Sequence, residues 1–297
     1  MRSTLHLLAA LALAAQPVRA DCQLMRVAAL DIAIDRYGGI TVPAAINGHD
    51  VHLMIDTGGA FSAIAPEMLA AIGLEPKTLG GGAAYMFGGR RMGAAAKAQS
   101  FKLGSLDTSR MSFIVLPPHS LAPDVAGTIG AEVLGDYDVD IDIGHGKLNL
   151  FRRNGCGVDV VYWSADPWGQ VDLLDNLDNH LTFHATLDGH PLKAMLDTGM
   201  SVTEMDLASA RAMFGWSEAE TPKPDKYGEA QHSFGALTFD ALSVGHPQVT
   251  LDARGNFGFV SGSEETPIIV GMDVLKHLHL YISYQQRKIY FTAADAH

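Results

Sequence analysis

Two aspartates in this chain occupy the same local sequence pattern. The first lies in Met54-Ile55-Asp56-Thr57-Gly58 and the second in Met195-Leu196-Asp197-Thr198-Gly199. The offset between them is 197 − 56 = 141. If the two segments belong to a duplicated fold, their carboxyl groups can meet at a pseudo-twofold axis. Two carboxyl groups that close share one proton, because both cannot ionise easily, and such a pair can activate water against an amide.

The constant offset extends beyond the two tripeptides. Gly48-His49 recurs as Gly189-His190, and Ile40-Thr41 recurs as Leu181-Thr182, both at the offset of the aspartates. Further matches pair Leu103-Gly104 with Val244-Gly245, Ile129-Gly130 with Val270-Gly271, and residues 148–151 with 288–291, whose phenylalanines are 140 apart. Such an offset over about a hundred residues indicates two copies of one folding unit, rather than chance spacing of glycines.

The first 20 residues predict a secretory signal peptide. Arg2 gives the positive start, residues 5–15 form a short apolar run, and Val18-Arg19-Ala20 is a small-residue cleavage site. The apolar run is too short for a membrane anchor. The residues before Cys22 make a poor lipidation signal. We therefore expect an exported protein, periplasmic or secreted, without stable membrane insertion.

The charge and length of the chain limit the classes of protein to which it can belong. The formal net charge is −12, and removal of Arg2 and Arg19 with the signal peptide makes it −12 − 2 = −14. An acidic exported protein is not expected to bind nucleic acid. The part of the 297-residue chain that follows the signal peptide is long enough for two lobes with separate cores. The turn-rich segment 154–157 places the boundary, so we expect lobes over residues 21–157 and 158–297.

The chain has two cysteines, Cys22 and Cys156, one at each end of the expected first lobe. In an oxidising compartment they can form one disulfide, which would tie the mature N-terminus to the end of that lobe. Two unpaired thiols are the alternative.

The pattern of short, often alternating apolar segments predicts a mostly β protein with few helices. The expected helices are 66–72, 131–134, 206–214 and 272–278, at equivalent places in the two halves. Residues 139–143 alternate strictly and predict a half-buried strand, with Asp140 and Asp142 on a solvated face rather than in a metal site. Glycines frame Tyr85, which indicates either a mobile hairpin over a ligand or an ordinary exposed loop.

With these features, the chain resembles the aspartic peptidases. The resemblance rests on the two Asp-Thr-Gly tripeptides, each followed by a helix and later by two apolar residues and a glycine. The spacing is similar to that of the retropepsin-like branch found in bacteria, here with both halves in one chain. The resemblance implies an acid protease-like fold, in which two homologous closed-barrel-type lobes are related by a pseudo-twofold axis.

The resemblance also implies roles for individual residues. Asp56 and Asp197 would be the catalytic pair, one as general base on a bound water and the other as proton donor to the scissile carbonyl. Thr57 and Thr198 would interlock the two loops. The residues expected to contact an extended peptide are Gly58, Gly199 and, within a flap, Tyr85. The family uses no metal and no cofactor, and one chain with both halves is expected to act as a monomer.

The two halves depart from each other just after the tripeptides. Gly59 and Ala60 follow in the first half, whereas Met200 and Ser201 follow in the second. Pepsin-like members tend to have a hydroxyl at the position of Ser201, where it can bond the catalytic carboxylate. Since only Asp197 would gain that bond, which favours the ionised form, we expect Asp197 to be the more acidic of the pair.

The leading hypothesis is therefore an exported aspartic endopeptidase that cleaves extended polypeptides between its lobes. A catalytically silent peptide-binding module of the same fold and a self-processing or single-substrate peptidase are the alternatives. The close histidine pairs 49/52 and 277/279 lack a second cluster with zinc-ligand spacing, so no metal site is expected. The chain has neither a Gly-x-Ser-x-Gly elbow nor a phosphate-binding loop motif.

Overall fold

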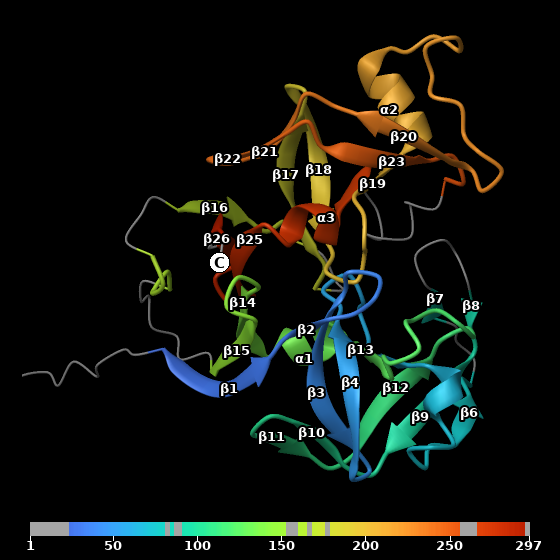
Figure 1. Ribbon diagram of the computed structural model, residues 1–297, viewed down its shortest axis with the longest axis vertical. Helices are drawn as coiled ribbons and strands as arrows, with labels where there is room; N and C mark the ends of the chain where they lie inside the picture. Colours follow the sequence, from blue (N-terminus) through green and yellow to red (C-terminus); the bar gives the residue numbers. More distant parts are fainter. Residues whose placement is uncertain are drawn as a thin grey trace, which may run out of the picture.

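The computed structural model describes residues 24–80, 84–85, 91–152, 160–164, 168–175, 179–255 and 266–294, with only the backbone described at 84–85. The predicted signal peptide, both cysteines and the predicted lobe boundary at residue 157 lie outside these ranges. The described chain is mostly β, with one lobe above the other (Figure 1). Among the described residues, no helix has the length and apolar character needed to cross a membrane.

The first lobe is a curled sheet of ten described strands, in the order β11-β10-β3-β4-β13-β5-β12-β9-β6, with β2 paired to β3. A separate hairpin, β7-β8, lies beside it. The strands of this lobe are β2 (Ala33–Ile34), β3 (Ile40–Ile46), β4 (His49–Ile55), β5 (Ala63–Ile64), β6 (Pro76–Thr78), β7 (Ala84–Tyr85), β8 (Arg91–Met92), β9 (Ala94–Ala98), β10 (Phe101–Leu103), β11 (Leu106–Thr108), β12 (Met111–Val115) and β13 (Gly127–Ile129).

The second lobe is a curled sheet of eight described strands, in the order β20-β23-β19-β24-β18-β17-β21-β22. Its central strands match those of the first lobe, because β18 pairs in parallel with β24 as β4 does with β13. The strands are β17 (Leu181–Leu187), β18 (His190–Leu196), β19 (Glu204–Asp206), β20 (Glu229–Ser233), β21 (Ala236–Phe239), β22 (Leu242–Gly245), β23 (Gln248–Asp252) and β24 (Ile268–Val270).

A third sheet joins the lobes and takes strands from both halves. Its order is β1-β15-β14-β25-β26-β16. Counted from the two edges, β1, β15 and β14 of the first half correspond to β16, β26 and β25 of the second half. The strands are β1 (Met25–Asp31), β14 (Tyr137–Asp142), β15 (Lys147–Arg152), β16 (Gly169–Asp172), β25 (Leu278–Ser283) and β26 (Lys288–Ala293). The pseudo-twofold axis passes between β14 and β25, which pair antiparallel. We call this the interlobe sheet. The architecture confirms the predicted two-lobe acid protease-like fold.

The repeat offset of 141 holds for the elements nearest the two aspartates. Strand β3 begins at Ile40 and β17 at Leu181, while β13 ends at Ile129 and β24 at Val270. The turns between β3 and β4 and between β17 and β18 are also equivalent. Each has two residues with positive φ, Asn47 (52°) and Gly48 (82°) in the first and Asp188 (49°) and Gly189 (79°) in the second. Such two-residue turns suit the twist of a β-hairpin.

Two of the sequence matches do not correspond in the structure. Leu103 lies in β10, which pairs with β3, whereas Val244 lies in β22, which pairs only with β21 in the described chain. The strand pairings instead make β10 equivalent to β21. The match of residues 148–151 with 288–291 is out of register by one, because Leu148 pairs with Ile141 and its equivalent Ile289 pairs with Ile282.

Four short helical segments are present in the described chain, close to where the sequence predicts them. They are η1 (Pro66–Met68), α1 (Ala131–Leu134), α2 (Leu207–Phe214) and α3 (Met272–Leu275). Two are shorter than predicted, since η1 ends at Met68 and α3 at Leu275. The side chain of Asp206 caps α2 by accepting from the Ser209 amide at 2.7 Å. Gly215 ends α2 with a φ of 64°, a conformation that favours glycine.

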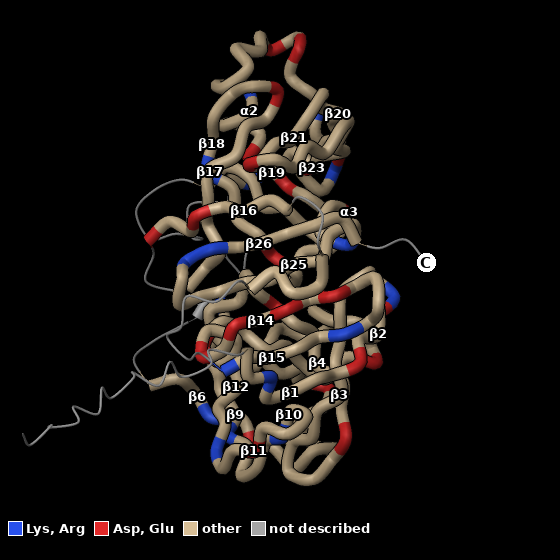
Figure 2. Tube along the Cα trace, turned by 90° about the vertical axis from the view of Figure 1, so that its left-hand side faces the viewer, with Lys and Arg blue, Asp and Glu red and all other residues tan. Residues whose placement is uncertain are grey.

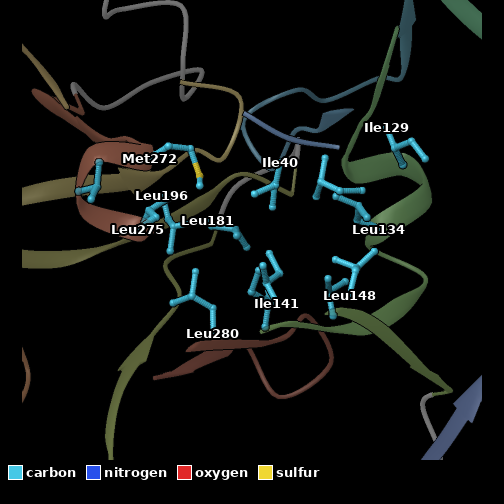
Figure 3. Close-up of a cluster of buried hydrophobic side chains, with 14 of the residues drawn as sticks. Ile40, Ile129, Leu134, Ile141, Leu148, Leu181, Leu196, Met272, Leu275 and Leu280 are labelled. Atoms are coloured by element: carbon cyan, nitrogen blue, oxygen red, sulfur yellow. The ribbon is translucent and has the colours of Figure 1, made fainter. Parts of the chain in front are cut away.

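One continuous apolar core runs through both lobes. Figure 3 shows that it includes Ile40, Ile129 and Ile141 of the first half beside residues of the second. The labelled residues of the second half are Leu181, Leu196, Met272, Leu275 and Leu280. Because the interlobe sheet contributes Ile141 and Leu280 to this core, burial of apolar surface couples the lobes.

The acidic face of β14 is not solvated as predicted. Figure 2 shows acidic positions along β14 across the middle of the molecule, yet Asp138 is only 7% exposed and Asp140 fully buried. The segment 160–164 covers this face with Tyr162 and Trp163. Burial is tolerated because Asp140 accepts hydrogen bonds at 2.8 Å from Asn149 and 2.5 Å from Tyr162.

Candidate active site

The two aspartates leave their strands in the same way. Strand β4 ends at Ile55, and the Asp56 amide donates to the carbonyl of Ile129 at 3.0 Å. In the second lobe, the Asp197 amide donates to the carbonyl of Val270, also at 3.0 Å. Each aspartate is therefore fixed by the neighbouring parallel strand just where its own strand ends.

The two threonines that follow the aspartates join the loops across the pseudo-twofold axis. The Thr57 amide donates to the hydroxyl of Thr198 at 3.2 Å, and the Thr198 amide donates to the hydroxyl of Thr57 at 3.0 Å. Each hydroxyl then donates to a carbonyl of the opposite lobe, that of Leu196 at 3.1 Å or Ile55 at 2.6 Å. Both threonines are buried, so water does not compete for these bonds.

This interlock brings the two carboxyl groups into contact. Asp56 and Asp197 form a side-chain hydrogen bond with each other. Each carboxylate also accepts from a loop amide, Asp56 from Gly59 at 2.8 Å and Asp197 from Gly199 at 2.7 Å. Asp197 is 7% exposed, and Asp56 is half-buried. The pair therefore lies at the lobe interface, with part of its surface open to solvent.

The environment separates the proton affinities of the two carboxyl groups. Burial, followed by the negative charge of Asp197, raises the pKa of Asp56 to about 8. Burial also raises the pKa of Asp197, but three loop amides and the hydrogen bond from Asp56 lower it. Those amides belong to Gly199, Gly58 and Met200. These contacts favour the charged form of Asp197, in a pair that titrates as a unit.

The glycines of the two tripeptides make room for this contact. A Cβ on Gly58 would lie 2.1 Å from Oδ2 of Asp197, and a Cβ on Gly199 would lie 2.6 Å from Oδ1 of Asp56. Each glycine thus allows the carboxylate of the opposite lobe to approach its backbone. Their contact with a peptide stays a prediction.

Ser201 does not act as predicted. Its side chain is exposed, and within the described chain no hydrogen bond joins its hydroxyl to Asp197. The predicted order of acidity stays a prediction, and its support comes from backbone amides and Asp56, which favour the charged form of Asp197. Met200 is half-buried and packs against Met195 and Ile269.

Sequence reasoning missed two hydrogen bonds behind each loop, which link a hydroxyl residue to a glycine amide and to a carboxylate. In the first lobe, Ser62 accepts from the Gly130 amide at 3.0 Å, and its own amide donates to Glu132 at 2.7 Å. In the second lobe, Thr203 accepts from Gly271 at 3.1 Å and donates to Asp273 at 2.7 Å. The missed signal was the repeat offset itself, because it relates Ser62 to Thr203 and Glu132 to Asp273.

The remaining predicted residues are only partly placed. Tyr85 pairs with Arg91 in the hairpin β7-β8, but its side chain lies outside the described residues. Cys22 and Cys156 also lie outside them, so their pairing stays a prediction. Among the side chains that are described, no group of His, Cys, Asp and Glu has an arrangement that could hold a metal ion.

Comparisons with known proteins agree with this geometry. Residues 42–133, within the first lobe, match a family described as aspartyl protease. The crystal structure of an aspartic proteinase from Irpex lacteus is similar to this chain, with a TM-score of 0.56 and 11% identity over 90% of this chain and 97% of that one. At this identity the likeness shows the fold alone. A comparison with curated proteins found no match.

Together, the family match and the fold confirm the resemblance to aspartic peptidases. The family match supports a hydrolase of the peptidase class, and the structural likeness supports the fold. They do not separate the retropepsin-like from the pepsin-like branch.

Proposed function

We propose that this chain is an exported aspartic endopeptidase, which hydrolyses peptide bonds with a water molecule activated by Asp56 and Asp197. The observation that carries the proposal is the hydrogen-bonded carboxyl pair on two loops that the threonines interlock. A pair of acids with separated proton affinities is what general acid–base catalysis at an amide requires. The peptide would lie extended in the cleft between the lobes.

In the proposed cycle the shared proton starts on Asp56, which gives each aspartate a role. Ionised Asp197 accepts a proton from the water, while Asp56 donates its proton to the scissile carbonyl oxygen. Attack of the water oxygen then forms a tetrahedral gem-diol. As the C–N bond breaks, Asp197 returns its proton to the leaving nitrogen, and Asp56 takes one back from a gem-diol hydroxyl. The two cleavage products then leave, and the pair returns to its starting protonation state.

Three features of the chain support this cycle. The interlock of Thr57 and Thr198 holds the two carboxyl groups at fixed separation, which reduces the reorganisation needed for catalysis. The amides of Gly59 and Gly199 hold each carboxylate in place. Because the pair is buried, the surrounding dielectric is low, and electrostatic interactions with the two carboxyl groups are strong.

The test is cleavage of a mixed peptide pool between about pH 3 and pH 9, with and without a statine-type inhibitor. We expect inhibitor-sensitive cleavage that declines as the pH rises through about 8, where Asp56 loses its proton. Asp56→Asn and Asp197→Asn should each abolish cleavage while thermal unfolding stays cooperative. Asp50→Asn is the matched control, since Asp50 is exposed on the strand that leads to Asp56, and it should cleave like the parent.

Two results would reject the proposal. Equal cleavage by the parent and both active-site variants would exclude the pair as the catalyst. Binding of peptides by the parent without any cleavage would favour the silent peptide-binding module instead.

Export is part of the same proposal and rests on the N-terminal sequence. Expression of the full chain in a bacterium, followed by fractionation and N-terminal sequencing, should yield a mature protein that begins at Asp21. Retention of residues 1–20 in the cytoplasmic fraction would contradict it.

A further inference from the structure

The second lobe contains a buried acidic cluster on the strand that follows the Asp197 loop. Glu204 is the first residue of β19, and it pairs with Thr250 of β23. Asp252 lies two residues further along β23, opposite Glu229 of β20. Glu204 is 8% exposed and Asp252 fully buried. Glu204, Asp252 and Glu229 therefore share one face of three neighbouring strands, and Asp206, which accepts from Ser209, pairs with Asp252 on the same face.

Among the described residues, one arginine, Arg254, makes hydrogen bonds to this cluster, and neither bond reaches Glu204. Arg254 donates to Oδ1 of Asp252 at 2.8 Å and to Glu229 at 3.1 Å. Three carboxylates against one guanidinium leave a formal charge of −3 + 1 = −2 when all are ionised. The cluster is thus not neutralised from within.

Two buried oxygens of the cluster have no partner among the described atoms. They are Oε2 of Glu204 and Oδ2 of Asp252. Leaving such acceptors unpaired costs free energy in the absence of a ligand, since each has lost its water. Burial, then the charges of Asp252 and Glu229, raises the pKa of Glu204 to about 7, although Arg254 opposes the shift. An incoming hydrogen-bond donor with a positive charge would relieve both costs.

The cluster lies on the face that in the first lobe adjoins the hairpin β7-β8. The repeat offset relates Glu204 to Ala63, and Ala63 packs against Met92 of β8. In Figure 1, strands β20 and β23 of the second lobe and the hairpin β7-β8 of the first lie on the same side of the molecule. Arg254 and Glu229 form an exposed rim, with side chains 46% and 37% exposed.

A positively charged side chain fits the cluster better than a metal ion. Among the described side chains, no set of acids and histidines has the arrangement of a metal site. Lysine and arginine, in contrast, carry several N–H donors on a long apolar stem that can reach a buried acceptor.

We propose that Glu204 and Asp252 form a subsite that selects a lysine or arginine side chain of the polypeptide substrate. The proposal rests on the peptidase function proposed above. It makes Glu204 a specificity-determining residue, because a buried acceptor without a partner discriminates strongly against side chains that cannot supply a donor.

The test compares peptides that are identical except for one residue, which is lysine, norleucine or glutamate, scanned through each position around the scissile bond. We expect the parent to prefer lysine to norleucine in kcat/KM by about tenfold or more at one position. Glu204→Gln keeps the shape but removes the charge, and should reduce that ratio to about one. Glu218→Gln, an exposed glutamate of the same lobe, is the matched control and should keep the ratio.

A binding measurement makes the test independent of cleavage. In the Asp56→Asn background, the lysine peptide should bind about tenfold more tightly than the norleucine peptide, and Glu204→Gln should remove the difference. Thermal unfolding confirms that each variant is folded. A preference for lysine that survives Glu204→Gln, or no preference in a parent that cleaves, would overturn the subsite while leaving the peptidase intact.

Two further outcomes are informative. If the parent cleaves nothing yet binds lysine peptides through Glu204, the peptidase fails and the cation subsite stands. If millimolar Ca²⁺ raises the unfolding temperature of the parent but not of Glu204→Gln, the acids bind a metal and the subsite proposal is overturned.

Discussion

Immediately after the aspartate loops, equivalent strands of the two lobes carry different kinds of side chain. In the first lobe, Ala63 of β5 pairs with Ile114 and packs in an apolar cluster with Leu116. In the second, Glu204 of β19 stands in the place of Ala63 and pairs with Thr250. One face is apolar and the equivalent face is acidic, although the backbone pairing is the same.

The comparison shows where duplication is maintained and where it is not. The strands before the aspartates, the threonine interlock and the contacts behind each loop are equivalent in both lobes. These parts hold the two carboxyl groups in a symmetric arrangement. A change to them in one lobe alone would therefore disturb the pair. Beyond these parts the buried side chains differ, with Ala63 in one lobe and Glu204 in the other.

The interlobe sheet shows a second difference, between β14 and β25. Strand β14 supplies buried acids, whereas β25 supplies side chains that form hydrogen bonds with them. His279 contacts Asp140 at 2.6 Å, and Ser283 donates to Asp138 at 2.9 Å. Tyr281 donates to Asp138 at 3.2 Å. The two halves thus carry complementary rather than identical residues where they meet.

The largest effect is expected from breaking the symmetric interlock. Thr57→Val and Thr198→Val each remove a hydroxyl that donates to one buried carbonyl and accepts from one buried amide. Leaving two buried groups unpaired should lower the free energy of unfolding by about 4 kcal/mol and abolish cleavage. Denaturant unfolding and peptide assays measure both. If one variant is far milder than the other, the lobes do not contribute equally to the interlock.

The second-largest loss of stability is expected from substitution of the buried acids of β14. Asp140→Ala removes the acceptor of His279, Asn149 and Tyr162, so the free energy of unfolding should fall by about 3 kcal/mol. Tyr162→Phe removes a single donor and should cost about 1 kcal/mol. Denaturant unfolding at neutral pH tests both. Equal losses in the two variants would mean that the network does not centre on Asp140.

The acidic face of the second lobe should affect stability in a pH-dependent way. The pKa of Glu204 is raised from 4.5 to about 7, so the folded state holds a proton that the unfolded state has lost between these pH values. Stability from this group is fully present below pH 4.5 and lost as the pH rises to about 7, by up to about 3 kcal/mol. Glu204→Gln cannot titrate, so its free energy of unfolding should rise relative to that of the parent between pH 4.5 and about 7. The apolar equivalent Ala63 can show no such dependence.

The measurement is the free energy of unfolding of parent and variant at several pH values from about 4 to about 8. Other titrating groups affect both proteins alike, so the difference isolates Glu204. A difference that stays constant across the range would show that the acidic cluster does not raise the proton affinity of Glu204.

The residues that hold the carboxyl pair could be predicted from the sequence, because a constant offset is retained where both copies must meet. Strand bounds around Asp56 and Asp197 follow that offset. The middle of each lobe does not follow it. Strands β10 and β21 are equivalent by pairing but begin at residues 101 and 236, which are 236 − 101 = 135 apart. The offset is again 141 at β13 and β24, which begin at residues 127 and 268, so a constant offset pairs Leu103 with the wrong strand.

Burial of the acids on β14 could not be predicted from alternation alone. A period of two assigns Val139 and Ile141 to one face and Asp138 and Asp140 to the other, and the core received the apolar face. What covers the second face depends on the distant segment 160–164, which the local pattern does not contain. The same limit applies to Glu204, whose acidic neighbours come from strands β20 and β23.

The smallest effect on stability is expected at two exposed apolar residues five positions after the aspartates. Phe61 is 60% exposed and its equivalent Val202 is 43% exposed, so Phe61→Ala and Val202→Ala should change the free energy of unfolding by no more than about 0.5 kcal/mol. If they contact substrate, KM should rise about fivefold for Phe61→Ala and about threefold for Val202→Ala, in proportion to the apolar surface removed. Met25→Ala, at an exposed residue of β1, should leave KM unchanged. A rise in KM for only one of the two would show that substrate contact is asymmetric even where the lobes present the same kind of side chain.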